Sequence, residues 1–181
     1  DKDPVFRIRK TLSSNGGVVD ASIHHNSTKA AEQLLLAALA RQRDIVFDGT
    51  MAWKPFVEQT IACVRDTGNV YTKGPGFVAH NDGTTTEEYW RKVTDADELA
   101  KVTEASTMVP LADRLPYVIE MVGVTCAAEV AVARGLSRYL STNRPVPIAG
   151  QIRSHCQFAS NFMTYVDLVD CVKLFDTTQP N

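Results

Sequence analysis

Residues 44–50 read DIVFDGT, and this stretch decides the expected fold. The apolar run 45–47 ends at Asp48 and Gly49, a pattern typical of a parallel strand covered on both faces by helices. Ligands of open α/β sheets bind outside the carboxyl ends of the strands. We therefore expect Asp48 and Thr50 to face a pocket, with Gly49 letting the backbone approach a ligand closely. An Asp-Gly pair also turns a chain without any further role, and the motif alone leaves that alternative open.

The composition restricts the partners. The 181 residues fit one domain, and their 44% hydrophobic content is enough to bury a substantial core. The net charge is −2 and the sequence pI is near 6.1, so no global basic field indicates nucleic acid or an anionic membrane surface. The longest apolar run, residues 34–40, is too short to span a bilayer. We expect a soluble unit whose anion binding is local.

Cysteine and histidine spacing argues against disulfides and metal. The four cysteines lie far apart, form no CxxC pair and follow no secretory leader, which predicts reduced thiols in an intracellular compartment. Any organelle leader would lie upstream, so cytoplasm, mitochondrion and plastid stay open. The adjacent His24 and His25 have no third ligand at a standard spacing, and we expect no metal there.

Helical and strand patterns alternate along the chain. Apolar residues at helical spacing predict helices, and two further apolar runs predict strands. The expected helices cover 27–42, 55–66, 127–140 and 149–169, a short helix lies within 3–12, and the additional strands cover 117–125 and 171–175. This order is the signature of an α/β fold.

Residues 67–115 interrupt that rhythm and read as an insertion. Turn signals cluster at residues 74–76 and 81–83. Segments 87–92 and 95–105 look like short polar helices. We expect a hairpin plus helices here.

Three arginines are candidates for phosphate binding. Arg134 and Arg138 are one helical turn apart, and Arg144 follows in a loop stiffened by prolines. Guanidinium groups bind phosphate oxygens in a fixed two-pronged geometry. Because the helix follows the strand at 117–125, these arginines are expected near the same sheet edge as Asp48. A solvated basic face is the alternative.

Two further side chains have two interpretations each. Glu32 sits in an otherwise aliphatic helix, either on its water-facing stripe or reaching for a ligand hydroxyl. Trp53 follows the DGT turn and either stacks on a planar ligand or packs against the helix start. His155 is expected to pack or hydrogen-bond and not to catalyse.

Taken together, these motifs resemble the zeta-toxin family of P-loop kinases. More narrowly, DGTMAWKPF, GPGF with DGTTTEEYW, PYVIEMVGVTC and QIRSHCQFASNFMTYVDLVD resemble the zeta-toxin-type kinase domain of plant calmodulin-dependent NAD kinases. The resemblance covers nearly the entire chain, 1–181, as the C-terminal portion of such a domain. It implies a three-layer parallel sheet with helices on both faces.

The resemblance also implies a reaction and roles. The reaction is transfer of a phosphoryl group from ATP, with Mg²⁺, to a hydroxyl of NAD or a nucleotide sugar. Glu32 and the turn of Asp48, Gly49 and Thr50 would lie on the substrate side. Arg134 and Arg144 would hold phosphate charge in the transition state, and Arg138 is a weaker candidate for the cofactor side.

One part of the family pattern is absent from the sequence. No GxxxxGK[ST] motif occurs in residues 1–181, and this is the loop whose backbone N–H groups and lysine cradle the triphosphate. We expect the first strand and this loop to lie upstream, so that this chain alone is inactive. The alternatives are a non-catalytic kinase-like subunit of a larger assembly and a nucleotide hydrolase. Calmodulin would act only through regions outside this chain.

Overall fold

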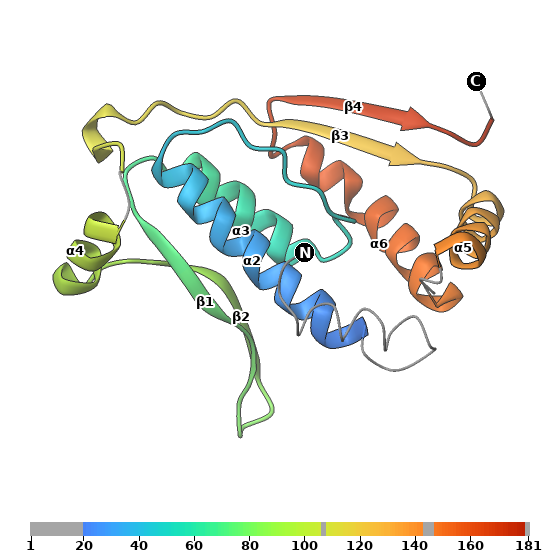
Figure 1. Cartoon of the computed structure of the whole chain (residues 1–181), viewed down its shortest axis with the longest axis horizontal. Helices are drawn as coiled ribbons and strands as arrows, with labels where there is room; N and C mark the ends of the chain where they lie inside the picture. The colour runs from blue at the N-terminus through green and yellow to red at the C-terminus, as the bar shows by residue number, and fades with distance from the viewer. Residues whose placement is uncertain (1–19, 106–107, 143–146, 180–181) are drawn as a thin grey trace.

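The computed structural model describes residues 20–105, 108–142 and 147–179, with side-chain detail for all of these except 20–26 and 101–105. The short helix expected within 3–12 lies outside the described residues. The elements in chain order are α2 (Asp20–Ala40), α3 (Lys54–Arg65), β1 (Tyr71–Ala79), β2 (Thr85–Lys92), α4 (Ala96–Ala105), the 3₁₀ turn η1 (Leu111–Asp113), β3 (Glu120–Thr125), α5 (Ala128–Thr142), α6 (Ile148–Val166) and β4 (Cys171–Asp176). Figure 1 shows β1 and β2 projecting on one side of the helices, with β3 and β4 along another.

Segment 67–115 contains a hairpin followed by a helix, as expected. Strands β1 and β2 pair antiparallel from Tyr71↔Lys92 to Ala79↔Thr85, with an irregularity between Lys73 and Gly76. The turn is closed by His80 N–H donating to the Thr84 carbonyl at 2.8 Å. The helix expected at 95–105 is confirmed as α4. The helix expected at 87–92 is wrong, because this segment pairs with β1 and its side chains alternate between two faces.

The second sheet is a parallel pair. Strands β3 and β4 are in register from Glu120↔Cys171 to Thr125↔Asp176, and helices α5 and α6 connect them. The strands expected at 117–125 and 171–175 and the helices expected at 127–140 and 149–169 are confirmed within a few residues. A parallel pair needs such a crossover connection. The apolar patterns of the sequence therefore indicated these strands and helices correctly.

The strand expected at 45–47 is not formed. Residues 43–53 are neither helix nor strand, and Val46 is 98% exposed. The segment runs along the side of β3 away from β4 (Figure 1). A strand needs a neighbour that pairs its backbone groups, and no described residue pairs with 45–47. Instead of one sheet covered by helices on both faces, the described residues form two separate two-stranded sheets.

Helix α3 joins the two halves of the core. One side of α3 contributes Val57 and Ile61 to a cluster with Met121 and Tyr165, and Tyr165 is completely buried. Its other side contributes Cys63 to a cluster with Leu35 and Trp90. Helix α3 begins after Trp53 with a proline in its first turn, a position that needs no donated hydrogen bond. Helix α2 begins at Asp20, earlier than the start expected at Ser27.

Candidate functional site

The turn after the DIVF run is an exposed loop in the structure. Asp48, Gly49 and Thr50 are all exposed, and a Cβ added at Gly49 would meet nothing within 4 Å. Gln42 and Met51 bracket the segment with positive φ values of 51° and 49°. Non-glycine residues rarely adopt this conformation, and it clusters at functional sites. The loop is therefore open to a ligand and has a constrained backbone at both ends.

Hydrogen bonds from the opposite half anchor this loop. The Tyr165 hydroxyl donates to the Met51 carbonyl at 3.0 Å, and the Asn161 side chain donates to the Ala52 carbonyl at 3.2 Å. At the other end, the Tyr117 hydroxyl donates to the Arg43 carbonyl at 3.0 Å. Burial raises the pKa of Tyr165 above its usual value, so this phenol stays protonated and keeps donating at physiological pH. The position of the loop thus depends on hydrogen bonds from α6 at one end and from Tyr117, just before β3, at the other.

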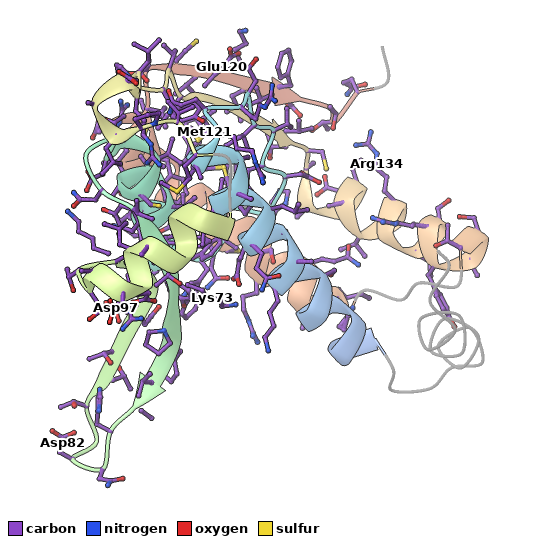
Figure 2. The ribbon with its side chains drawn as sticks, turned by 60° about the vertical axis from the view of Figure 1, so that its left-hand side comes forward. Lys73, Asp82, Asp97, Glu120, Met121 and Arg134 are labelled. Atoms are coloured by element: carbon purple, nitrogen blue, oxygen red, sulfur yellow. The ribbon has the colours of Figure 1, made fainter. Side chains whose placement is uncertain are left out.

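Glu32 is buried in the structure and does not lie on a water-facing stripe of α2. It is 7% exposed and is the buried charged side chain among the residues with side-chain detail. Its carboxylate forms an ion pair with Lys73 of β1, so the pair links α2 to the hairpin (Figure 2 labels Lys73). Burying a carboxylate is expensive unless it is paired. This placement gives Glu32 a definite structural partner, whatever its role toward a substrate.

Arg134 lies at the carboxyl end of the parallel pair. Its guanidinium donates to the Thr177 hydroxyl at 2.9 Å and to the Thr177 carbonyl at 2.7 Å. Thr177 in turn donates through its backbone N–H to the carbonyl of Thr125, the last residue of β3, at 2.8 Å. The side chain of Arg134 is otherwise exposed and lies away from the hairpin tip in Figure 2. The sequence pattern predicted Arg134 near the same sheet edge as Asp48, but the strand expected to carry Asp48 is not formed.

Arg138 and Arg144 are the other two arginines expected to bind phosphate. Arg138 is exposed on α5, and its backbone carbonyl accepts hydrogen bonds from the Ser141 and Thr142 hydroxyls. Arg144 lies outside the described residues. His155 hydrogen-bonds the Cys126 carbonyl at 2.8 Å, the polar contact expected of it.

The sequence pattern missed a polar and aromatic cluster next to the loop. Trp53 Nε1 donates a bifurcated hydrogen bond to Glu87 Oε2 at 2.9 Å and to the Tyr89 hydroxyl at 2.6 Å. The Tyr89 hydroxyl donates to the same Glu87 oxygen at 3.0 Å. Burial, followed by the Glu87 carboxylate, raises the pKa of Tyr89. We call Trp53, Glu87 and Tyr89 the Trp53 cluster. Reading 87–92 as a strand would have placed Glu87 and Tyr89 on one face.

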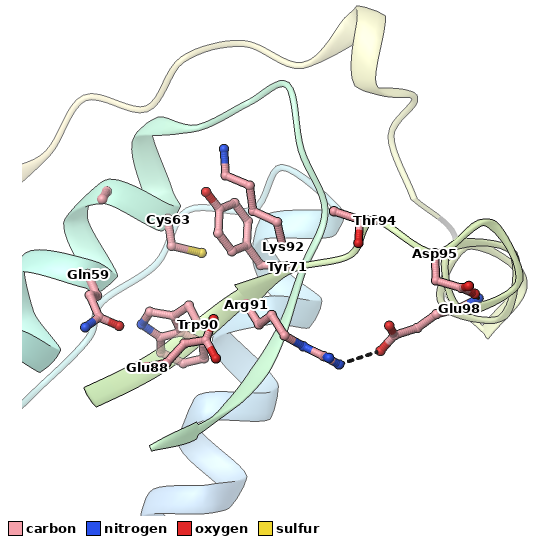
Figure 3. A pocket seen from close by; sticks show the side chains of 11 residues that line it. Gln59, Cys63, Tyr71, Glu88, Trp90, Arg91, Lys92, Thr94, Asp95 and Glu98 are labelled. Carbon is pink, nitrogen blue, oxygen red and sulfur yellow. Dashed lines mark hydrogen bonds and ion pairs between the residues drawn. The ribbon is translucent and has the colours of Figure 1, made fainter. Parts of the chain in front are cut away.

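A cavity of about 530 Å³ lies on the other side of the hairpin, between α3, β2 and α4 (Figure 3). Its lining is mostly charged and polar, and the Arg91 guanidinium bridges to Glu98 at 3.3 Å across it. The buried Cys63 thiol also lines it, and burial together with nearby Asp66 raises the pKa of that thiol to about 12. Cys63 is therefore a protonated core residue and not a nucleophile.

A second cavity, also about 530 Å³, lies between α2, α3 and residues 114–117. Arg114 lines it and donates to the carbonyls of Val109 and Asn69, both at 3.3 Å. Its Nη2 atom is buried without a hydrogen-bond partner in the described part of the chain, and burial lowers its pKa. Neither of these two cavities is lined by Asp48 or Arg134.

The described residues contain no group of three or more His, Cys, Asp or Glu side chains arranged to hold a metal ion. No helix in ranges 20–105, 108–142 and 147–179 is long and apolar enough to cross a membrane.

Comparison with known proteins gives one informative result. No protein-family model matches the chain, and no solved structure matches it. Over 180 residues it is 40% identical to a protein of Arabidopsis thaliana described as calmodulin calcium-dependent NAD kinase. The chain is related to part of an NAD kinase. The matched stretch is 98% of the chain but 32% of that relative, so the chain spans about a third of the relative's length.

Proposed function

We propose that this chain is the acceptor-binding part of an ATP-dependent phosphotransferase of the zeta-toxin type that phosphorylates a hydroxyl of NAD. The observation that carries the proposal is the 40% identity to an NAD kinase across 98% of the chain. Identity of this extent over so long a stretch supports a common fold and a common reaction class. Calmodulin, which is part of that relative's name, would act here through regions outside residues 1–181.

The proposed roles are those that the resemblance implies. Asp48 and Thr50 sit on an open, anchored loop, where they would orient the acceptor hydroxyl. Arg134 lies at the carboxyl end of the parallel strands, where its guanidinium would neutralise charge on the transferring phosphoryl group. Glu32 would support this side of the site through its ion pair with Lys73.

The residues present do not themselves provide a site for ATP and Mg²⁺. Residues 1–181 contain no phosphate-binding loop with its lysine and Ser/Thr, and the described residues contain no carboxylate cluster suited to a divalent ion. We therefore assign no step through these groups to this chain. In the proposal, protein outside this chain supplies them.

The structure also supports a place for one more strand. β3 pairs on one edge with β4, and its other edge faces segment 43–53 (Figure 1). Val122 and Val124 are 54% and 65% exposed, and Val46 is 98% exposed. Parallel strands are normally covered on both faces, and an unpaired strand edge is a template for pairing with another strand. An extended segment between β3 and residues 45–47 would complete the P-loop kinase-like sheet expected from the resemblance.

The test compares two polypeptides for formation of NADP from NAD and Mg-ATP. The chain 1–181 is expected to give no turnover, and a polypeptide extended by its own upstream coding sequence is expected to turn over. In the extended form, Arg134→Ala should lower kcat on the order of 10³-fold. The matched control is Arg153→Ala, which removes an exposed arginine from α6, and it should change kcat less than about twofold.

Two outcomes would contradict the proposal. If the extended polypeptide forms no NADP and its upstream sequence lacks GxxxxGK[ST], the non-catalytic alternative is correct. If Arg134→Ala turns over like the unaltered polypeptide, Arg134 has no part in the transfer. The melting temperature of each variant shows whether the loss of the bonds to Thr177 has only unfolded the protein.

A further inference from the structure

The Trp53 cluster exposes an aromatic ring beside a carboxylate. Trp53 is 47% exposed, although its one polar atom is already bonded to Glu87 and Tyr89. What remains open on this side chain is therefore the ring surface. The cluster comes directly after the exposed turn of residues 48–50, and Trp53 immediately precedes α3.

Other aromatic side chains extend this surface. Phe77 is the cross-strand partner of Glu87 on the hairpin and is 57% exposed. Phe47 is 42% exposed and its ring lies tilted by 35° to that of Phe56, with 6.2 Å between the centroids. The Phe56 ring meets Tyr89 edge-on at 5.2 Å. Exposed apolar side chains that lie together on a surface can mark a binding site.

Within the described part of the chain, the charge of Glu87 is not neutralised by a basic group. Its two side-chain donors, the Trp53 indole and the Tyr89 phenol, are neutral. The nearby lysines are engaged elsewhere, since Lys54 pairs with Glu58 at 3.7 Å and Lys73 pairs with Glu32. The start of α3 adds a partial positive charge of about half a unit, which the full charge of Glu87 exceeds. The surface is thus aromatic with a net negative charge.

An aromatic face beside a carboxylate favours a flat cation over a flat neutral ring. Cations are attracted to the electron-rich face of tryptophan more than to any other ring. An indole whose N–H is donated to a carboxylate is richer in electrons still. The ring of oxidised nicotinamide is a planar cation, because its nitrogen carries the ribose as a fourth bond, whereas the ring of reduced nicotinamide is neutral.

We propose that the Trp53 cluster binds the positively charged nicotinamide ring of oxidised NAD and disfavours the reduced form. The identity of the dinucleotide rests on the proposed function, but the preference for a cationic ring rests on the cluster itself. Trp53 would bind a ring and not the reacting hydroxyl. Substituting it should therefore change KM and not kcat.

The cluster can be tested in the chain 1–181 without any turnover. Trp53 and Trp90 are its two tryptophans, and Trp90 is 6% exposed, so quenching by a solute reports mainly on Trp53. The probes are N1-methylnicotinamide, which is cationic, and nicotinamide, which is neutral and nearly the same size. We expect the cationic probe to bind about threefold to fivefold more tightly.

Two glutamate variants isolate the charge. Glu87→Gln keeps an oxygen that accepts both hydrogen bonds but removes the charge, and it should reduce the preference to less than about twofold. Glu88→Gln is the matched control, because the neighbouring strand position points to the opposite face and lines the cavity of Figure 3. It should leave the preference unchanged. Equal binding of both probes, or an unchanged preference in Glu87→Gln, overturns the inference.

Kinetics separate this inference from the proposed function. In the extended polypeptide, Trp53→Leu should raise KM for NAD about fivefold with kcat unchanged, while Trp53→Phe should lie in between. If the extended polypeptide forms NADP but Trp53→Leu does not change its KM for NAD, the proposed function stands and the inference is refuted. If the chain prefers the cationic probe but the extended polypeptide forms no NADP, the inference stands and the proposed function is refuted.

Discussion

The hairpin half and the parallel half of this molecule are covered to very different degrees. In the hairpin half, Trp90 of β2 packs with Leu35 of α2 and Cys63 of α3, all at most 6% exposed. In the parallel half, α6 covers the face of β3 that carries Met121, while the opposite face leaves Val122 and Val124 half exposed or more. Hydrophobic strands are stable when both faces are covered. The difference shows that the buried cluster of the hairpin half is covered more fully than the outer face of β3.

Glycine substitutions give the largest expected difference between the halves. A Cβ at Gly74 in the hairpin would lie 2.8 Å from the Glu88 carbonyl carbon and 3.1 Å from that of Tyr89. Backbone cannot move aside without breaking the hairpin, so Gly74→Ala should cost about 3 kcal/mol. At Gly123 of β3 the nearest atom is Leu174 Cδ1 at 2.7 Å, the end of a flexible side chain, so Gly123→Ala should cost about 1 kcal/mol.

Urea unfolding measures both glycine variants. Equal losses of unfolding free energy would show that the parallel half is as rigidly packed as the hairpin and would break the comparison. Gly49→Ala serves as the control, because a Cβ there meets nothing within 4 Å.

Lysine-to-methionine substitutions come next. Lys73→Met keeps the aliphatic stem but leaves the buried Glu32 carboxylate without its ion-pair partner. A fully buried pair would lose about 3–5 kcal/mol, but the Lys73 side chain is 39% exposed, so screening reduces the expected loss to about 1–2 kcal/mol. The counterpart in the parallel half is Lys173→Met, whose partner Glu120 lies 2.5 Å away across exposed strands. Lys173→Met should lose less unfolding free energy than Lys73→Met. Thermal unfolding measures both variants, and a larger loss in Lys173→Met would contradict the assigned role of Glu32.

The smallest effect is a dependence on pH. Burial works against ionisation of Asp66, but hydrogen bonds from Lys92, Asn69 and Tyr71 outweigh it and lower the pKa from 3.8 to about 2. A pKa lowered in the folded state stabilises the protein above the unfolded value, and this stabilisation is lost as the pH falls through the folded value. Asp66→Asn should therefore cost about 1 kcal/mol at pH 7, and the difference should shrink between pH 4 and pH 2.

Asp170→Asn is the corresponding change in the parallel half. Asp170 accepts hydrogen bonds from the Ile119 backbone N–H at 2.8 Å and from Arg65 at 3.1 Å, and these lower its pKa. Its contribution should disappear on acidification in the same direction as that of Asp66. Urea unfolding from pH 7 to pH 2 measures the stability difference between each variant and the unaltered protein. A difference that grew on acidification would contradict the assigned hydrogen bonds.

Most helices and both parallel strands were predictable from the sequence. Helices α3, α5 and α6 and strands β3 and β4 all follow apolar patterns at the spacing of their own type, which depends on neighbours along the chain. The turns of segment 67–115 were also recognisable, because glycine and Asn-Asp-Gly interrupt that spacing. These features are local, so the sequence contains them.

Other features depend on which segments meet, and only the tertiary structure decided them. Segment 45–47 has the composition of a strand, but no described segment pairs with its backbone. Segment 87–92 is polar enough for a surface helix, but its pairing with β1 makes it a strand. Likewise Glu32 became a buried partner of Lys73, and Trp53 joined Glu87 and Tyr89. Pairing and burial are contacts between residues distant in sequence, and no local pattern specifies them.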